Sequence, residues 1–323
     1  MEDKSPFFWI ILFAIAVVVI AGVAFYIGLN PSGNNTTKGI GNVSDIEVRA
    51  LYEGTVQVPE ITLETTLPKV SGKIMVYTAI LGIDREEVHR MANELGIRGE
   101  EKEESGFIIV QNENFQLDAE LPSGVVYYKN NTEQSGYDEA TIEKYLPSDE
   151  EARKIADTFL ATRNLRPENA VFHDITHNEG FLSGDPPSKC WESINVDYSH
   201  EMNGYSLLTD QFRVEIGVHG TILSMFEKWT YYEPFKEYPV ITPDEAINSL
   251  KKSGIVIPSG MKDPQKATVT SVTLGYIGET QSGNLPYLIP VYVFEGTVEG
   301  ADGSSAAFYQ WIPATPELAA EIT

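Results

Sequence analysis

Ser148 to Trp229 is the stretch that decides the predicted fold; it begins SDEEARKIADTFLATRN (148–164) and ends FRVEIGVHGTILSMFEKW (212–229). Ser148 and Glu151 have the spacing of a capping box, in which each side chain pairs with a backbone N–H that the first helical turn leaves unsatisfied. Apolar residues then recur at the spacing of one helical face: Ala152, Ile155, Ala156, Phe159 and Leu160. We therefore predict a helix that needs an apolar surface to pack against.

The end of the same stretch predicts two paired strands. Phe212, Val214 and Ile216 alternate with polar residues, which is typical of an antiparallel strand with one buried face. His219-Gly220 offers a tight turn, because glycine tolerates a positive φ and histidine sometimes adopts one. A second strand over 221–226 completes the hairpin, and one face of this sheet can receive the helix.

The same helix start occurs twice more in the chain. Asp84 precedes Glu87, and Thr242 precedes Glu245, in both cases at the capping-box spacing. Strand patterns follow each helix, at 107–110, 115–117, 125–128, 269–276, 287–298 and 306–312. The order predicts an α+β fold of tandem modules, each a helix packed on an antiparallel sheet, with boundaries at 51–146, 147–235 and 236–323. The alternative is three ordinary capped helices within one irregular α+β fold.

The N-terminal region predicts a membrane anchor. Residues 7–29 form a run of about 23 apolar and small residues, long enough as a helix to cross a hydrocarbon core about 30 Å thick. The length of the run and its flanks favour an uncleaved transmembrane helix within 1–30 over a cleaved signal peptide. Residues 31–50 then read as a flexible linker. The predicted localisation is the cell membrane, single-pass, with the C-terminal domain outside the cytoplasm.

Composition excludes some partners. The formal net charge of -24 argues against nucleic acid, whose phosphates require Lys and Arg on the binding surface. Cys190 is the only cysteine, so no intrachain disulfide is possible. No phosphate-binding glycine loop or nucleophile elbow is present, and we predict no cofactor, no metal and no catalytic residue. The run Glu100–Glu104 is most simply a solvated connection.

Two groups of residues are candidates for function. Trp229, Tyr231, Tyr232, Phe235 and Tyr238 form an aromatic connector between the second and third modules, which either binds a partner or packs one module against the next. His173 and His177, with Asp174 and Glu179 nearby, resemble a metal cluster. The segment alternates like a strand, however, and a separation of four would then place the two histidine backbones roughly 13 Å apart.

The order of motifs also resembles a known family. The helix from Ser148, the turn at Asn203-Gly204 and the hairpin at His219-Gly220 resemble PepSY-like modules. Leu274-Gly275-Tyr276, with the run 285–296, resembles the ending of YycI/YycH-like regulatory proteins, although Tyr292 replaces the usual Trp. The resemblance covers about half of the chain. It implies a single-pass anchor whose extracytoplasmic modules bind and modulate a partner, such as a sensor kinase or a peptidase, with no catalytic residues.

The expected function is accordingly that of a non-enzymatic, membrane-anchored binding or regulatory protein whose partner is another membrane or envelope protein. Sheets of this kind can recruit a peptide along an exposed edge. The alternative is a metal-dependent envelope hydrolase that uses His173 and His177.

Overall fold

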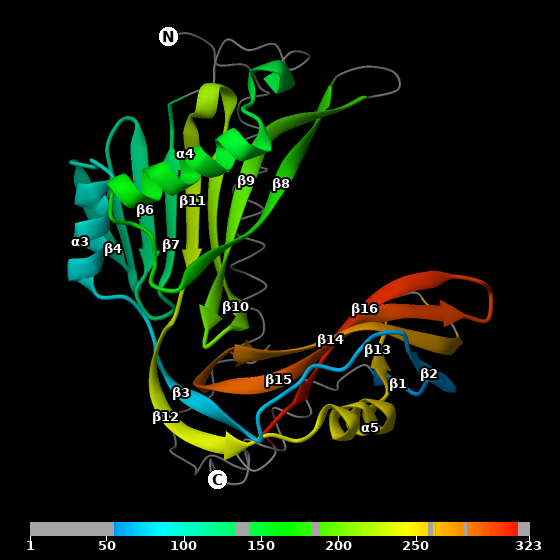
Figure 1. Ribbon diagram of the computed structural model, residues 1–323. Coiled ribbons are helices and arrows are strands. Elements are labelled where there is room, and N and C mark those ends of the chain that lie inside the picture. Colours follow the sequence, from blue (N-terminus) through cyan, green and yellow to red (C-terminus); the bar gives the residue numbers. More distant parts are fainter. Residues whose placement is uncertain are drawn as a thin grey trace. The chain divides into compact units, whose positions relative to one another are not determined.

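The computed structural model describes residues 55–132, 142–182, 188–257, 261, 263–280 and 283–315 (Figure 1). In these ranges β-strands greatly outnumber helices: sixteen strands accompany three α-helices and two short 3₁₀ helices, η1 (Ile142–Tyr145) and η2 (Val218–Gly220). Two main hydrophobic cores form, one on each of two groups of strands.

The first group is an antiparallel run of eight strands. Its order is β4, β5, β6, β7, β11, β10, β9, β8. The bounds are β4 Glu100–Glu104, β5 Phe107–Gln111, β6 Phe115–Glu120, β7 Val125–Asn130, β8 Ala170–Leu182, β9 Ser188–Met202, β10 Tyr205–Ile216 and β11 Ile222–Lys228. The central pair joins segments distant in sequence, because Tyr128 of β7 lies opposite Met225 of β11.

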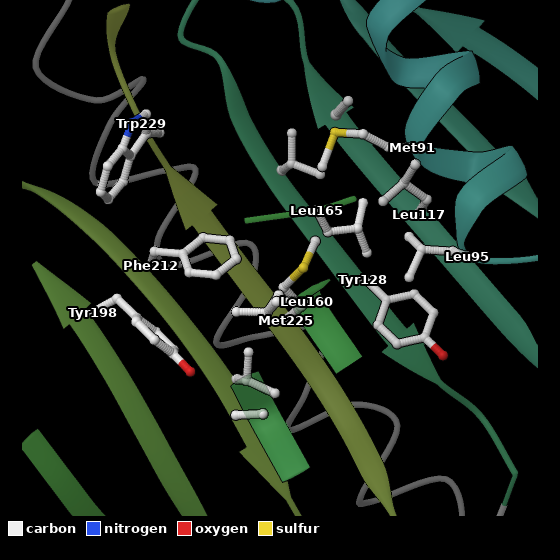
Figure 2. Close-up of a cluster of buried hydrophobic side chains, with 14 of the residues drawn as sticks. Met91, Leu95, Leu117, Tyr128, Leu160, Leu165, Tyr198, Phe212, Met225 and Trp229 are labelled. Atoms are coloured by element: carbon white, nitrogen blue, oxygen red, sulfur yellow. The ribbon is translucent and has the colours of Figure 1, made fainter. Parts of the chain in front are cut away.

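Helices α3 (Arg85–Glu94) and α4 (Asp149–Thr162) pack on one face of this run and share one core (Figures 1 and 2). Met91 and Leu160, one from each helix, belong to the same buried cluster as Leu117 and Met225 from the strands. The predicted caps are confirmed: the Glu151 N–H donates to the Ser148 hydroxyl and the Glu87 N–H donates to the Asp84 carboxylate.

The two predicted turns are confirmed as well. His219 and Gly220, between β10 and β11, have φ of 54° and 76°, and Asn203 and Gly204, between β9 and β10, have φ of 52° and 79°. These are left-handed values that glycine and asparagine adopt at low cost. The turns therefore set the register of three successive strands.

The second group of strands shares the second core with α5 (Pro243–Ser253). Its order is β12, β3, β15, β14; β16 also pairs with β15 and β2 with β14. The bounds are β2 Glu60–Leu63, β3 Lys73–Ile80, β12 Tyr231–Pro239, β14 Pro264–Thr280, β15 Gly283–Gly300 and β16 Ser305–Pro313, while β1 Thr55–Val56 pairs with β13 Ile255–Val256. A short parallel contact, Leu207 of β10 opposite Tyr276 of β14, connects the two groups.

The predicted fold class is wrong. Each helix does follow its expected cap, and α5 has its predicted capping box at Thr242 and Glu245. The strands after α3 and α4, however, merge into one sheet over one core, and β3, from the first predicted module, lies between β12 and β15. The protein is therefore a mainly β fold built on a large shared sheet, and a set of tandem helix-on-sheet modules is not observed. Glu100–Glu104, predicted as a solvated connection, is instead the exposed edge strand β4.

The predicted anchor, residues 7–29, and its linker lie outside the described residues. Within the ranges that the structure describes, no helix is both long enough and apolar enough to cross a bilayer. The predicted single-pass localisation, with a domain outside the cytoplasm, is accordingly withdrawn.

Candidate functional site at the start of strand β12

The five residues of the predicted aromatic connector divide into two sets. Trp229 and Tyr238 are buried, and Tyr232 is half-buried against the core around α5. Tyr231 and Phe235 are exposed, at 45% and 48% of their full area. The first set is therefore part of the interior, and only the second set faces solvent.

A buried polar pair fixes Trp229 in place. The Trp229 indole stacks on the His200 imidazole with ring centroids 4.2 Å apart and planes 9° apart. His200 Nδ1 lies 2.7 Å from Asp210 Oδ2, and both side chains are almost fully buried. The same Asp210 oxygen accepts the Thr230 N–H at 3.1 Å. Because a buried charge needs its partners, these contacts hold the chain firmly just before β12 begins.

Four large apolar side chains stand exposed beyond this anchor, and we call them the aromatic edge: Ile80, Leu81, Tyr231 and Phe235. Tyr231 lies directly opposite Ile80 in the β12–β3 pairing, so these two side chains share one face of the sheet. Their exposed fractions, together with that of Leu81, are 45%, 47% and 49%. Grouped apolar exposure of this kind is characteristic of interaction surfaces, whereas single exposed apolar residues are common.

The backbone at this edge is interrupted. In the described strand order β12 is terminal and pairs with β3 alone. The register shifts between Pro234 and Lys236, so Phe235 occupies a bulge. Proline has no N–H to donate, and bulges break the row of backbone groups that would pair with another strand. The edge is therefore suited to docking through its side chains more than to continuous strand pairing.

Charged groups lie next to Tyr231. Glu227, near the end of β11, is 8% exposed and lies between Phe212 of β10 and Val126 of β7. Burial, with the nearby charge of Glu87, raises the pKa of Glu227 to about 8, against the opposing effect of Arg90. Arg90 itself binds the Glu87 carboxylate through two hydrogen bonds of 2.7 and 2.6 Å.

The phenol of Tyr231 interacts with the same group of charges. Its own burial is the main factor that raises its pKa, and the charges of Glu227 and Glu87 add to this, while Arg90 opposes them. Tyr231 therefore presents an exposed ring to solvent and sits within electrostatic reach of a buried carboxyl group.

The candidate metal residues are not brought together. His173 and His177 lie on β8, which confirms the predicted strand. His177 Nε2 lies 3.1 Å from an Asp149 carboxylate oxygen, and its ring packs against Trp191 with centroids 5.1 Å apart. Across the described ranges, no group of three or more His, Cys, Asp and Glu side chains has a geometry that could hold a metal ion.

The polar residues of this site were not predicted from the sequence. The alternation along the strands nevertheless places charged residues at positions expected to be buried. Glu227 lies at the alternate strand positions that Met225 and Trp229 also occupy, all of them buried. His200 likewise lies two residues from the buried Tyr198. A charged residue in the apolar phase of a strand either has a buried partner or is an unusual group. His200 has such a partner in Asp210, whereas Glu227 does not have an equivalent one among the described residues.

A second polar cluster, also unpredicted, covers the opposite face of the eight-stranded run. The Glu215 carboxylate accepts from the Ser193 hydroxyl at 2.6 Å, from the Asn178 amide at 2.9 Å and from the Ser224 hydroxyl at 2.8 Å. The Glu215 carboxylate and its three donors therefore satisfy one another's hydrogen bonding. We therefore read it as a structural network that ties β8, β9, β10 and β11 together.

No family model matches the chain. No curated protein matches it either. Among solved structures, the chain is similar to an uncharacterized protein from Eubacterium rectale, with a TM-score of 0.47 and 12% sequence identity over 85% of this chain and 97% of that chain. That similarity is too low to support an argument about fold or function.

Proposed function

We propose that this chain is a non-enzymatic protein-binding module with a regulatory role, and that the aromatic edge is its docking surface. The observation that carries the proposal is the clustering of Ile80, Leu81, Tyr231 and Phe235 at 45 to 49% exposure around one strand end. When a partner covers exposed apolar area, the complex is stabilised by about 25 cal/mol for each Å² that is buried. Aromatic side chains dominate the energetics of such interfaces.

Rigidity supports the same proposal. The segment before Tyr231 is held by the Trp229 stack and by the Asp210 hydrogen bond to Thr230. Phe235 is held by a ring contact with Tyr287 of β15, with centroids 5.0 Å apart. A pre-ordered surface loses less conformational entropy when it binds, so it binds more tightly for the same area.

The experiment is a binding measurement with a purified partner, first identified by crosslinking through a photoreactive group placed at Phe235. The double variant Tyr231→Ala/Phe235→Ala should weaken the affinity at least tenfold, because each truncation removes an interface aromatic side chain. Tyr309→Ala is the matched control: Tyr309 is also 45% exposed, but it lies on β16. Unchanged affinity in the double variant would refute the proposed surface.

The kind of partner remains a prediction. The PepSY-like and YycI/YycH-like resemblance implies that the partner is an enzyme, such as a sensor kinase or a peptidase, whose activity this chain modulates. The crosslinked partner can be assayed directly with and without the chain. The alternative of a metal-dependent hydrolase has no contact in the described residues to favour it over binding.

A further inference from the structure

We propose that Glu227 is the receptor for a cationic side chain, the ammonium of a lysine or the guanidinium of an arginine, supplied by the protein that docks on the aromatic edge. This inference rests on the proposed function and names the chemistry of the docking segment: an apolar stretch that carries a positive charge. The cation would pass beside the Tyr231 ring and pair with the Glu227 carboxylate.

Glu227 is buried and has no polar partner among the described residues. Only 8% of the residue is exposed, and its cross-strand neighbours Phe212 and Val126 are apolar core residues. In the described part of the chain, no hydrogen bond or ion pair reaches its carboxylate, and its oxygens are not among the fully buried unsatisfied atoms, so the carboxylate keeps a small opening to solvent. Such groups are rare, because a buried carboxyl group without a partner loses its hydrogen bonds to water and gains none in return. A missing ligand explains its retention at this position.

Arg90, the cationic side chain whose charge acts on Glu227, already binds other groups. The charged and titratable groups that face Glu227 are Glu87 and Arg90 on α3 and Tyr231 on β12. Arg90 binds both oxygens of Glu87 and also donates to the Asn164 carbonyl at 2.9 Å. The guanidinium therefore has hydrogen-bond partners other than Glu227, on which it acts only through its charge. Glu94 also acts on Arg90 and Glu168 on Tyr231, so with Glu227 ionised the carboxylates of this cluster outnumber its one guanidinium and attract a further cation.

The exposed ring of Tyr231 offers a cation one further favourable contact, because a cation can bind over the face of a tyrosine ring. The net charge of -24 attracts positively charged segments in the encounter.

A proton must leave when the cation binds. With a pKa raised to about 8, Glu227 is mostly protonated at pH 7 in the free protein. Pairing with a cation favours the ionised form, so each binding event releases up to one proton. Affinity should therefore fall as pH drops below about 8, by up to about tenfold per pH unit, since one proton is exchanged per unit of binding.

The test uses the full chain with ¹³C-labelled glutamate carboxyl groups and two capped probes, Ac-Leu-Lys-Leu-NH₂ and Ac-Leu-norleucine-Leu-NH₂. The Glu227 signal is assigned by its loss in Glu227→Gln. The lysine probe should lower the pKa of Glu227 by at least one unit at saturation, whereas the norleucine probe, which has the same four-carbon chain without the ammonium, should not. Equal effects of the two probes, or no effect of the lysine probe, would overturn the proposal.

The purified partner separates this inference from the proposed function. Glu227→Gln should weaken partner binding at least tenfold at pH 9 and abolish its pH dependence, while Glu299→Gln, an equal charge change at an exposed position of β15, should do neither. Binding that depends on Tyr231 and Phe235 but ignores Glu227 would refute the cation receptor alone. A lysine-dependent shift at Glu227 with partner binding that ignores Tyr231 and Phe235 would refute the docking surface alone.

Discussion

At the scale of single residues, the site depends on two buried ionisable groups, of which one has a polar partner and the other does not. His200 has its partner, Asp210, at 2.7 Å, whereas Glu227 lies among apolar neighbours. The first arrangement holds Trp229 and Thr230 in position. The second leaves an ionisable group that responds to pH and to ligands. A stable scaffold next to a responsive group is what a recognition site requires.

Removal of the His200 partner should be strongly destabilising. Asp210→Ala leaves a buried imidazole unpaired and frees the Thr230 N–H, and we expect a loss of about 3–5 kcal/mol in the free energy of unfolding, measured by urea titration. The matched control removes the carboxylate of a more exposed pair: Asp197→Ala, opposite Arg213, should cost less than about 1 kcal/mol. Equal losses would show that the buried pair contributes no more than a surface pair.

The pH dependence of stability should report Glu227. Its pKa is raised from 4.5 to about 8 on folding, so the folded protein holds one proton more than the unfolded chain between these values. Stability due to this group is fully present below about pH 4.5 and is lost as pH rises to about 8, at up to about 1.4 kcal/mol per pH unit. The difference in unfolding free energy between wild type and Glu227→Gln should therefore shift in favour of the variant as pH rises. A difference that is flat from pH 5 to pH 9 would contradict the raised pKa.

At the scale of elements, helix ends and turns were readable from sequence, because their signals are local. The caps at Asp84, Ser148 and Thr242 appear where the sequence places them. Glu100–Glu104 was not readable as a strand, because five charged residues in a row resemble a solvated loop. Its pairing with the apolar strand β5 makes it a strand, and its charges protect an open sheet edge from aggregation.

The ends of α3 and α5 each have a glycine with positive φ, and substitution of the two by alanine can be compared. Gly254 has φ of 83°, and an added Cβ would meet the Val56 carbonyl oxygen at 2.6 Å. Gly96, after α3, has φ of 75° but no atom within 4 Å of that Cβ position. Gly96→Ala should cost about 1–2 kcal/mol for the left-handed backbone alone. Gly254→Ala should cost more, because backbone atoms of the neighbouring segment must also move; the two unfolding free energies provide the comparison.

At the scale of the whole molecule, the helices and most strands could be predicted from the sequence, but the pairing of the strands with one another could not. The pairing of Tyr128 with Met225 joins strands from two predicted modules, and nothing local in either strand specifies its partner. The same applies to β3, which leaves its predicted module to pair with β12 and β15. Periodicity reveals which face of a strand is buried but not which strand lies beside it.

The same non-local assembly limited what could be predicted of the site. The aromatic connector was recognised as a candidate surface, but its division into buried Trp229 and exposed Tyr231 depends on contacts with His200 and with β3. The pKa of Glu227 is raised by burial and by the charge of Glu87 on α3, and α3 lies more than a hundred residues earlier in the chain.

A single core over the eight-stranded run predicts cooperative unfolding. Leu160→Ala removes a fully buried side chain of α4 and should cost about 2–5 kcal/mol. Amide hydrogen exchange should then accelerate in β5, β6 and β7 as well as in β8 to β11, because all belong to one core. Acceleration confined to β8 to β11 would indicate independent modules instead.

The measurement that tests the central claim most directly is the hydrogen-exchange footprint of the purified partner on the full chain. When the partner binds, we predict slower amide exchange at the end of β3 around Ile80 and along the first half of β12, from Tyr231 to Phe235. Exchange in β16 around Tyr309 should not change. A footprint elsewhere on the chain, with unchanged exchange in β3 and β12, would contradict the assignment of the aromatic edge as the docking surface.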